Sequence, residues 1–283
     1  IVTNAFSQSI SEATYSEEDS IVNLEDIVVT ATKTQKRKTN SPIIINVINS
    51  ESIRNVQACN LSESLSFQTG LRVETDCQTC NYTQLRINGM SGGFSQILIN
   101  GRPTFSPLMG LYALEQFPSN MIEKIEVMKG GGSTLYGSSA IGGTVNIITK
   151  IPKKNSSQIE FNTNSINRQS NDYSIVGNSS IVSESKKAGL SLFVNKRERE
   201  AYDNNDDGFS ELPYLNNISL GANMYYMPKE NQKLDVSFSS IYEYRYGGEI
   251  TNQNPAHVTE QSEERTHNIF AGGIDYQINF NNY

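Results

Sequence analysis

The 283-residue sequence predicts an α+β domain, with a small mixed sheet and short helices, followed by antiparallel strands of a transmembrane β-barrel. Two observations support this fold class. Residues 122–150 place a stretch rich in glycine and serine between two β-type runs, so the backbone there must turn repeatedly. From residue 151 onward, segments of about ten or more residues alternate apolar with polar side chains, as membrane β-strands do.

Composition narrows the class of protein. Hydrophobic residues make up 36% of the chain, and no apolar run approaches the roughly 20 residues that a membrane helix needs. Strands of a transmembrane barrel look polar on average, because their lumen-facing side chains are hydrophilic, so low hydrophobicity does not exclude a membrane protein. The formal net charge of -7, from 23 basic and 30 acidic residues, and the scarcity of basic clusters argue against a nucleic-acid partner.

The first residues are expected to lie outside the folded domains. Residues 1–8 have the composition of the end of a secretory signal whose charged start and apolar core are missing, or of an ordinary frayed terminus. Residues 9–23 are acidic and rich in serine without periodicity, which predicts a flexible segment. The next run, LEDIVVTATK at residues 24–33, favours a β-strand, either at the edge of the following domain or paired with a partner from outside.

The α+β domain is predicted to span residues 34–150. Residues 43–48 form an apolar run that is typical of a buried strand. Asn60 followed by Glu63 resembles a capping box, which predicts a helix with Leu61 and Leu65 on its buried face and Gly70 at its end. Further strands are expected at residues 71–74, 84–89 and 96–102.

The glycine-rich stretch carries an ordered series of motifs: Ile125-Glu126-Val127, Gly130, Ser133, Tyr136-Gly137, Ala140-Ile141-Gly142-Gly143 and Asn146-Ile147-Ile148-Thr149. It lacks the Gly-Lys-Ser/Thr of a phosphate-binding loop. The series resembles the end of the plug domain of TonB-dependent outer-membrane transporters. Residues 86–89 and 98–101 are similar to two further strands of that domain, with Asn100 where the family usually has aspartate. Gly131 stands where the family often has proline.

The resemblance covers residues 24–150 and implies a receptor in the outer membrane of a Gram-negative bacterium, in contact with outer-membrane lipid. Residues 34–150 would then be the plug domain. Residues 24–33 would be a TonB box, an extended peptide that adds as a strand to the energy-coupling protein TonB. In strand addition, main-chain hydrogen bonds supply the affinity and alternate side chains the specificity. The residues expected to bind TonB are Asp26, Ile27, Val28, Val29, Thr30 and Ala31.

In this family, loops at the outer tip of the plug face the transported ligand. By position, these residues are Thr75, Asp76, Gln78, Thr79, Asn81 and Tyr82 in one loop, and Thr104, Phe105, Ser106, Leu108, Met109 and Tyr112 in another. Packing against the barrel is the alternative role of the second loop. Cys77 and Cys80 have no further pair at zinc-site spacing and are candidates for a disulfide in an oxidising periplasm. Cys59 is expected to pack as a small apolar residue.

Beyond a linker at residues 151–155, the alternation predicts six strands near residues 157–167, 173–183, 188–200, 213–228, 233–249 and 265–281. Short turns at 184–187 and 229–232 alternate with longer polar loops at 168–172, 201–212 and 250–264, which is the connection pattern of an outer-membrane barrel with long extracellular loops. A soluble β-sandwich is the alternative, because its strands also alternate. Transporters of this family close at about 22 strands, so we expect an amino-terminal fragment with an incomplete barrel.

The loop at 201–212 contains the first half of a calcium-loop motif. Asp203, Asn205 and Asp207 place oxygen ligands at alternate positions, and Glu211 stands at the ninth position. Tyr214 occupies the twelfth position, where the motif needs glutamate. The loop is therefore either a Ca²⁺ site, as in the outer loops of cobalamin transporters of this family, or an ordinary solvated acidic loop.

The function implied by the resemblance is active import of a scarce metal chelate, a ferric siderophore or haem, which docks on the plug tip while TonB pulls on the box. A cobalamin importer is the alternative within the family, and a passive surface receptor or adhesin is the alternative from another class. His257 and His267 do not stand at ligand spacing, so haem has no local support. The sequence shows no Ser-His-Asp or paired-carboxylate arrangement at recognisable spacing, so we expect no enzymatic activity and no required cofactor.

Overall fold

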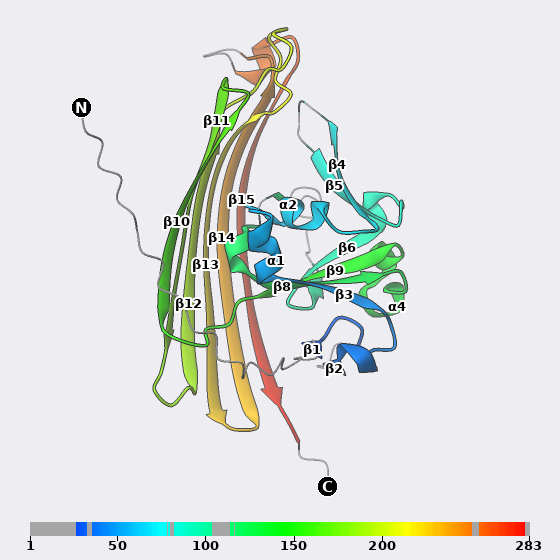
Figure 1. Cartoon of the computed structure of the whole chain (residues 1–283), viewed down its shortest axis with the longest axis vertical. Coiled ribbons are helices and arrows are strands. Elements are labelled where there is room, and N and C mark those ends of the chain that lie inside the picture. Colours follow the sequence, from blue (N-terminus) through cyan, green and yellow to red (C-terminus); the bar gives the residue numbers. More distant parts are fainter. Residues whose placement is uncertain are drawn as a thin grey trace, which may run out of the picture.

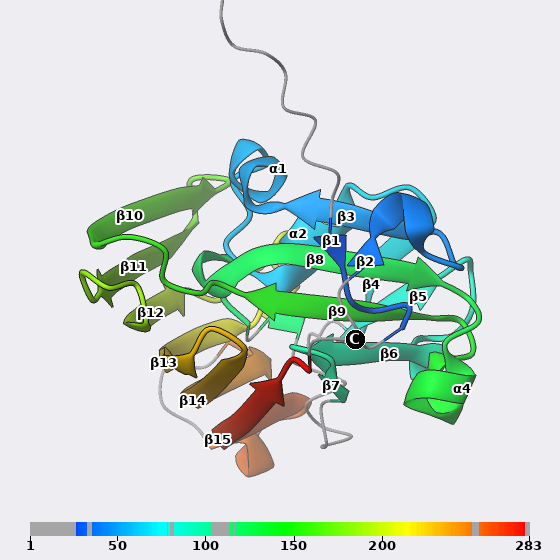
Figure 2. The ribbon, with the colours of Figure 1, turned by 90° about the horizontal axis from the view of Figure 1, so that it is seen from below.

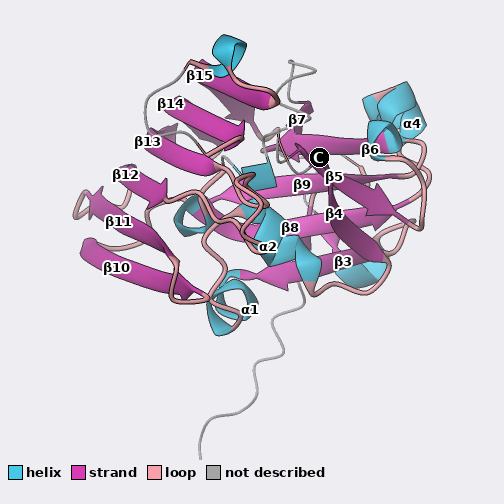
Figure 3. Ribbon diagram, turned by 90° about the horizontal axis from the view of Figure 1, so that it is seen from above, coloured by secondary structure: helices cyan, strands magenta, loops and turns pink. Residues whose placement is uncertain are grey.

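The structure is a computed structural model of the chain and describes residues 27–32, 36–77, 79, 82–103, 114–115, 117–250 and 255–280. Figure 1 shows a tall curved sheet with a smaller domain packed beside it. Seen from above, the strands of the tall sheet form a curved row along one side of the smaller domain (Figure 3). We call the tall sheet the wall and the smaller domain the plug.

The wall is a six-stranded sheet in which each strand pairs antiparallel with the next strand along the chain. The order begins at β10 and ends at β15, so the sheet is open. All six strands overlap the predicted segments, which confirms this part of the predicted fold class. The strands are β10 (Ser156–Ile166), β11 (Ser170–Val182), β12 (Ala188–Arg199), β13 (Tyr214–Lys229), β14 (Gln232–Gly248) and β15 (Ser262–Ile278).

The wall has two chemically different faces, because successive side chains of a strand point to opposite sides. On β13, Leu220 is 49% exposed, whereas its neighbour Ser219 is 2% exposed and is covered on the side of the plug. Phe238 of β14 repeats the outward pattern at 50%. The exposed apolar side chains of the outer face also include Ile159, Ile175, Leu192, Val194, Ile218, Met224, Phe270 and Ile274.

The plug is built on a five-stranded mixed sheet with the order β3-β8-β9-β6-β7, in which β6 and β9 run parallel and the other pairs antiparallel. Its strands are β3 (Ile45–Asn49), β6 (Ser95–Ile99), β7 (Arg102–Pro103), β8 (Ile122–Lys129) and β9 (Gly143–Thr149). Two smaller pairs are β1 (Ile27–Val28) with β2 (Lys36–Arg37), and β4 (Leu71–Cys77) with β5 (Tyr82–Ile87).

The helices of the plug are short. Within the described residues they include α1 (Ser50–Asn55), α2 (Leu61–Ser66) and α4 (Ser133–Tyr136), with single 3₁₀ turns at Lys38–Asn40, Gly92–Phe94, Ser119–Met121 and Ser138–Ala140. A further 3₁₀ turn, Ala256–Val258, precedes β15. Within the described residues, no helix combines the length and the apolar character needed to cross a membrane.

Helix α2 begins as its sequence predicts and ends earlier. The Asn60 side chain accepts a hydrogen bond from Glu63 N at 2.9 Å, while Glu63 Oε2 accepts one from Cys59 N at 2.8 Å, so the capping box is confirmed. The helix ends at Ser66, and Gly70 is not its end. With a φ of +76°, Gly70 instead turns the chain into β4, a conformation that glycine adopts without strain.

The core of the plug lies between its sheet and α2. Ile125 and Val127 of β8 pack with Leu61 and Leu65 of α2 in one buried cluster, which also contains Phe193 from β12 of the wall. The plug and the wall therefore share a hydrophobic core. Hydrogen bonds add to it: Asn120 Nδ2 donates to Gly177 O at 3.4 Å, and Asn223 Nδ2 donates to Lys150 O at 3.2 Å.

Candidate functional site

The segment at residues 27–31, which we call the box segment, lies against one face of the plug sheet rather than within it. Its first two residues form β1 and pair with β2, Ile27 opposite Arg37 and Val28 opposite Lys36. Val28 and Ala31 are buried and pack in a cluster with Ile45 of β3. Figure 2 shows β1 and β2 lying across the strands of the plug sheet. Asp26, the first residue assigned to TonB binding, lies outside the described residues.

A buried carboxylate of β8 holds the box segment. Glu126 Oε2 accepts hydrogen bonds from Val29 N at 2.9 Å, from Thr30 N at 3.0 Å and from Thr30 Oγ1 at 2.6 Å. Its other oxygen, Oε1, lies 2.8 Å from Lys124 Nζ, which also donates to Ile27 O. Both Glu126 and Thr30 are fully buried. A buried carboxylate needs such donors, because burial otherwise disfavours the charged form.

Two side chains from the glycine-rich stretch complete the site around Thr30. Tyr136 OH donates to Thr30 O at 2.8 Å, and Asn146 Nδ2 donates to Thr30 Oγ1 at 3.0 Å. Burial, and then the charge of Glu126, raise the pKa of Tyr136, so its phenol stays protonated and remains a donor at neutral pH. In the sequence, Tyr136, Asn146 and Glu126 stand out only as parts of the motifs that resemble the plug family. No local pattern indicates that they contact the box segment.

The outer tip of the plug is described only in part. The predicted loop at residues 75–82 is shorter than expected, because β4 continues to Cys77 and β5 starts at Tyr82. Thr79 is half-buried, and a Cβ added to Gly247 of β14 would overlap Thr79 O, so the hairpin tip leans on the wall. Gln78, Cys80, Asn81 and residues 104–112 lie outside the described residues. The ligand-facing loops and the Cys77–Cys80 disulfide therefore stay predictions.

Below the hairpin tip, an ion-pair network joins the plug to the wall. Arg245 of β14 is almost fully buried and pairs with Glu115 Oε2 of the plug at 2.7 Å and with Glu243 Oε1 at 2.7 Å. Thr83 Oγ1 donates to the other oxygen of Glu115 at 2.7 Å. Burial acts to raise the pKa of Glu115, but the charges of Arg245 and Arg199 outweigh it and hold the pKa below its ordinary value. No local pattern in the sequence indicates this long-range pairing.

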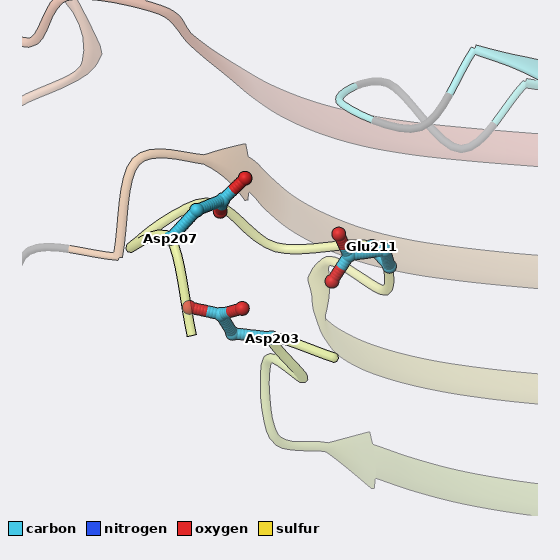
Figure 4. A group of neighbouring side chains, drawn as sticks. All are labelled: Asp203, Asp207 and Glu211. Carbon is cyan, nitrogen blue, oxygen red and sulfur yellow. The ribbon is translucent and has the colours of Figure 1, made fainter. Parts of the chain in front are cut away.

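The acidic loop between β12 and β13 brings together three of its four predicted ligands (Figure 4). One carboxylate oxygen from each of Asp203, Asp207 and Glu211 lies within 4.8 Å of the others. The amide of Asn205 contacts Asp207, with Nδ2 3.0 Å from Oδ2. Tyr214 does not replace the missing twelfth ligand, because its hydroxyl donates to Glu198 Oε1 at 3.0 Å.

The main chain of this loop is wound around Asp203. Its Oδ1 accepts from Asp206 N at 2.7 Å and its Oδ2 accepts from Gly208 N at 2.8 Å. Partial desolvation acts to raise the pKa of the Asp203 carboxyl, but hydrogen bonds from backbone N–H groups, that of Gly208 first, outweigh it and lower the pKa. The carboxylate is therefore charged and fixed in position, and carboxylate oxygens at this spacing suit a hard divalent cation.

A plug domain packed inside a wall of antiparallel strands, with apolar side chains on the outer face of the wall, defines an outer-membrane receptor of the plug-and-barrel class. Residues 37–144 match the family model described as TonB-dependent Receptor Plug Domain. Residues 37–144 are thus a plug domain of the TonB-dependent receptor type, followed by barrel strands, and the place of the chain is the outer membrane of a Gram-negative bacterium.

The names of two relatives refer to vitamin B12 transport and to regulation by iron. The vitamin B12 transporter BtuB of Vibrio cholerae is 28% identical over 178 residues, which cover 63% of this chain and 28% of that protein. The iron-regulated outer membrane virulence protein of Vibrio cholerae is 35% identical over 133 residues, covering 44% of this chain and 20% of that protein. The chain thus spans less than a third of the length of these relatives.

Solved structures agree with the fold. A mutant ferric enterobactin receptor PfeA from Pseudomonas aeruginosa superposes with a TM-score of 0.69 at 17% identity, covering 90% of this chain and 40% of that one. The pyoverdine-bound receptor FpvA from P. aeruginosa gives a TM-score of 0.71 at 15% identity, covering 90% and 34%. The siderophore receptor PirA from Acinetobacter baumannii gives 0.64 at 20% identity, covering 81% and 37%. At these identities the similarity concerns the fold.

Proposed function

We propose that the receptor to which this chain belongs imports a scarce metal chelate across the outer membrane, with TonB supplying the pull. The observation that carries this function is the box segment. It is a β-prone peptide ahead of the plug, with a two-residue strand at Ile27–Val28 followed by a turn, held by hydrogen bonds against one face of the sheet and not built into it. Such a peptide can leave the plug without breaking the strand order of the sheet, and can then add to TonB as a strand.

We propose a ferric siderophore or haem as the cargo and cobalamin as the second candidate. The iron-regulated relative supports an iron chelate. The relative named as a vitamin B12 transporter supports cobalamin. In either case the chelate docks on the outer tip of the plug, at the residues predicted for the loops beside the β4–β5 hairpin.

We further propose that the acidic loop binds Ca²⁺, with Asp203, Asp207 and Glu211 as carboxylate ligands. The clustered oxygens and the fixed Asp203 carboxylate support this assignment. Titration of Ca²⁺ into the purified receptor, with the heat of binding measured by calorimetry, tests this assignment. Asp203→Asn should abolish binding, whereas the matched Asp206→Asn change on the same loop should leave it intact. If the unaltered receptor gives no binding heat, the loop is a solvated acidic loop and not a Ca²⁺ site.

The import function is tested by uptake in cells that carry the complete gene. Labelled ferric siderophore, haem and cobalamin are offered to the unaltered receptor, to Val29→Pro and to Val29→Ala. Proline removes the N–H and fixes φ, so it prevents strand addition, whereas alanine keeps the N–H. We expect accumulation of one ligand with the unaltered receptor and with Val29→Ala, and loss of accumulation with Val29→Pro.

A passive surface receptor or adhesin predicts a different result. Ligand would bind to the cell surface equally with all three versions, and none of them would accumulate it inside. That outcome would exclude TonB-driven import.

A further inference from the structure

The outer face of the wall turns from apolar to polar along one line across its strands. On β12 the outward side chains are apolar up to Val194, and the next outward side chain is that of Lys196. On β13, Ile218 stands opposite Lys196 in the register, and the outward side chains turn polar at Asn216. From Ile218 down to Tyr226 they are apolar or aromatic, a span close to the roughly 9–11 residues with which a tilted strand crosses the hydrocarbon core. The line through Lys196 and Ile218 therefore marks where the wall leaves the hydrocarbon core.

This line lies toward the extracellular end of the wall. The strands are joined by short turns at residues 183–187 and 230–231, and by longer connections at residues 200–213 and 249–261. These two pairs of connections lie at opposite ends of the wall (Figure 1). In outer-membrane barrels the longer loops are extracellular. Lys196 lies near the end of β12 from which the connection at 200–213 begins, so its side chain is at the level of the outer-leaflet headgroups.

Tyrosine side chains just above the line support this depth. The rings of Tyr214 and Tyr244 meet edge to face with their centroids 6.0 Å apart. Tyr214 OH donates to Glu198 Oε1 at 3.0 Å, and Tyr244 OH donates to Glu264 Oε1 at 3.1 Å. Tyrosine suits the boundary between lipid and water, because its ring is apolar and its hydroxyl is polar. The outer face thus has the chemistry of a headgroup region immediately above Lys196.

The ammonium group of Lys196 has donors to spare. Its Nζ donates to Asn216 Oδ1, and Glu198 Oε2 lies 3.9 Å away, beyond hydrogen-bond distance. An ammonium carries three N–H donors, so these contacts leave donors for an acceptor from outside the chain. The side chain is 36% exposed, and it lies between Ile175 and Ile218 in the register of the sheet. A lysine with apolar neighbours on a lipid-facing surface directs its ammonium to the headgroup layer, where phosphates are the anionic acceptors.

We propose that Lys196 binds a phosphate group of an outer-leaflet glycolipid, and that Asn216 and Glu198 position its ammonium for this contact. A lysine ammonium acts as a compact point charge, so it can bind a phosphate without the fixed geometry that arginine needs. The inference concerns the lipid-facing side of the wall. It goes beyond the proposed import, which uses the plug and the opposite side of the wall.

The experiment measures how much lipid A, the phosphorylated glycolipid anchor of lipopolysaccharide, binds to the purified full-length receptor in a zwitterionic detergent. Bound lipid is counted by native mass spectrometry during a titration. Lys196→Met keeps an unbranched apolar side chain without the charge, and Lys196→Arg keeps the charge. The matched control is Lys187→Met, which removes a charge from the exposed turn at the other end of β12. Each version is titrated with diphosphoryl lipid A and with the same lipid after removal of its phosphates.

The phosphate contact is supported when Lys196→Met binds diphosphoryl lipid A about five- to tenfold more weakly than the unaltered receptor. Lys196→Arg and Lys187→Met should then bind as the unaltered receptor does, and removal of the phosphates should abolish the difference. If Lys196→Met does not fold, Lys196→Gln, which keeps a polar group, decides.

Three results would overturn the proposal. Equal binding by Lys196→Met and the unaltered receptor would show that Asn216 and Glu198 alone satisfy the ammonium. An equal loss in Lys187→Met would show a general effect of charge, and a loss that persists with the dephosphorylated lipid would show a contact with another part of the lipid. Neither TonB nor cargo is present in the experiment, so no result affects the import function.

Discussion

Gly143 begins β9 with a φ of +153°, and a Cβ at this position would lie 2.5 Å from Met128 O on the neighbouring strand. Neither the backbone angle nor the space admits a side chain. We predict that Gly143→Ala lowers the unfolding free energy of the receptor by about 2–4 kcal/mol, measured by denaturant titration in detergent. Gly93→Ala is the matched control, because a Cβ there meets no atom within 4 Å. Equal stability of the two variants would contradict this account.

Glu115 gives a prediction for pH, because its pKa is lowered in the folded receptor by Arg245 and Arg199. A carboxyl with a lowered pKa contributes stability that is present above its unfolded pKa, about 4.3, and is lost as the pH falls through its folded pKa. We predict that the unaltered receptor loses stability below about pH 4 more steeply than Glu115→Gln does. Thermal unfolding between neutral and acidic pH measures this, and parallel pH profiles would show that the ion pair contributes nothing.

At the scale of residues, contacts between neighbours in the sequence were predictable, and contacts between residues far apart in the sequence were not. The capping box of Asn60 and Glu63 was found because both partners lie within one helical turn. Thr30 and Glu126 were each singled out, but their hydrogen bond joins residues 96 positions apart, which no spacing rule reveals. The same limit hid the pairing of Glu115 with Arg245.

At the scale of elements, the wall was predictable, and among the small helices α2 was predictable from its capping box, whereas α1 and α4 were not. The strands of the wall are long, and their side chains alternate between the two faces of the sheet. In β13 and β14 the alternation therefore repeats often enough to be recognised in the sequence. Helix α1 has six residues and α4 has four, too few for a periodic pattern to appear. The hairpin β4–β5 was mistaken in part for a loop because its tip is polar.

The β4–β5 hairpin gives a prediction for cargo binding. Its tip leans on β14 at Gly247, where a Cβ would overlap Thr79 O and approach Pro213 Cβ to 2.9 Å. We predict that Gly247→Ala displaces the hairpin, at a cost of about 1–3 kcal/mol, and weakens equilibrium binding of the proposed chelate cargo. Gly272→Ala on β15 is the control, since the nearest atom to its Cβ is Ser237 O at 3.4 Å. Unchanged binding in both variants would place the cargo away from this hairpin.

At the scale of the whole molecule, the attachment of the plug to the wall differs from the attachment of the box segment to the plug. Its core and its ion pairs attach it to the wall, through Phe193 and through Arg245 with Glu115. The box segment, in contrast, is attached to the plug by the hydrogen bonds around Thr30 and by the packing of Val28 and Ala31 with Ile45. A pull on the amino terminus would act on these contacts before it acts on the core of the plug, and would then reach β8, which carries Glu126.

The measurement that tests TonB-driven import most directly is cargo accumulation in two isogenic strains that both carry the complete receptor, one with TonB and one without. Labelled ferric siderophore, haem and cobalamin are offered to each strain, and surface-bound and internal label are counted separately. We predict equal surface binding in the two strains and internal accumulation of one ligand only in the strain that has TonB. Equal accumulation in both strains would contradict it.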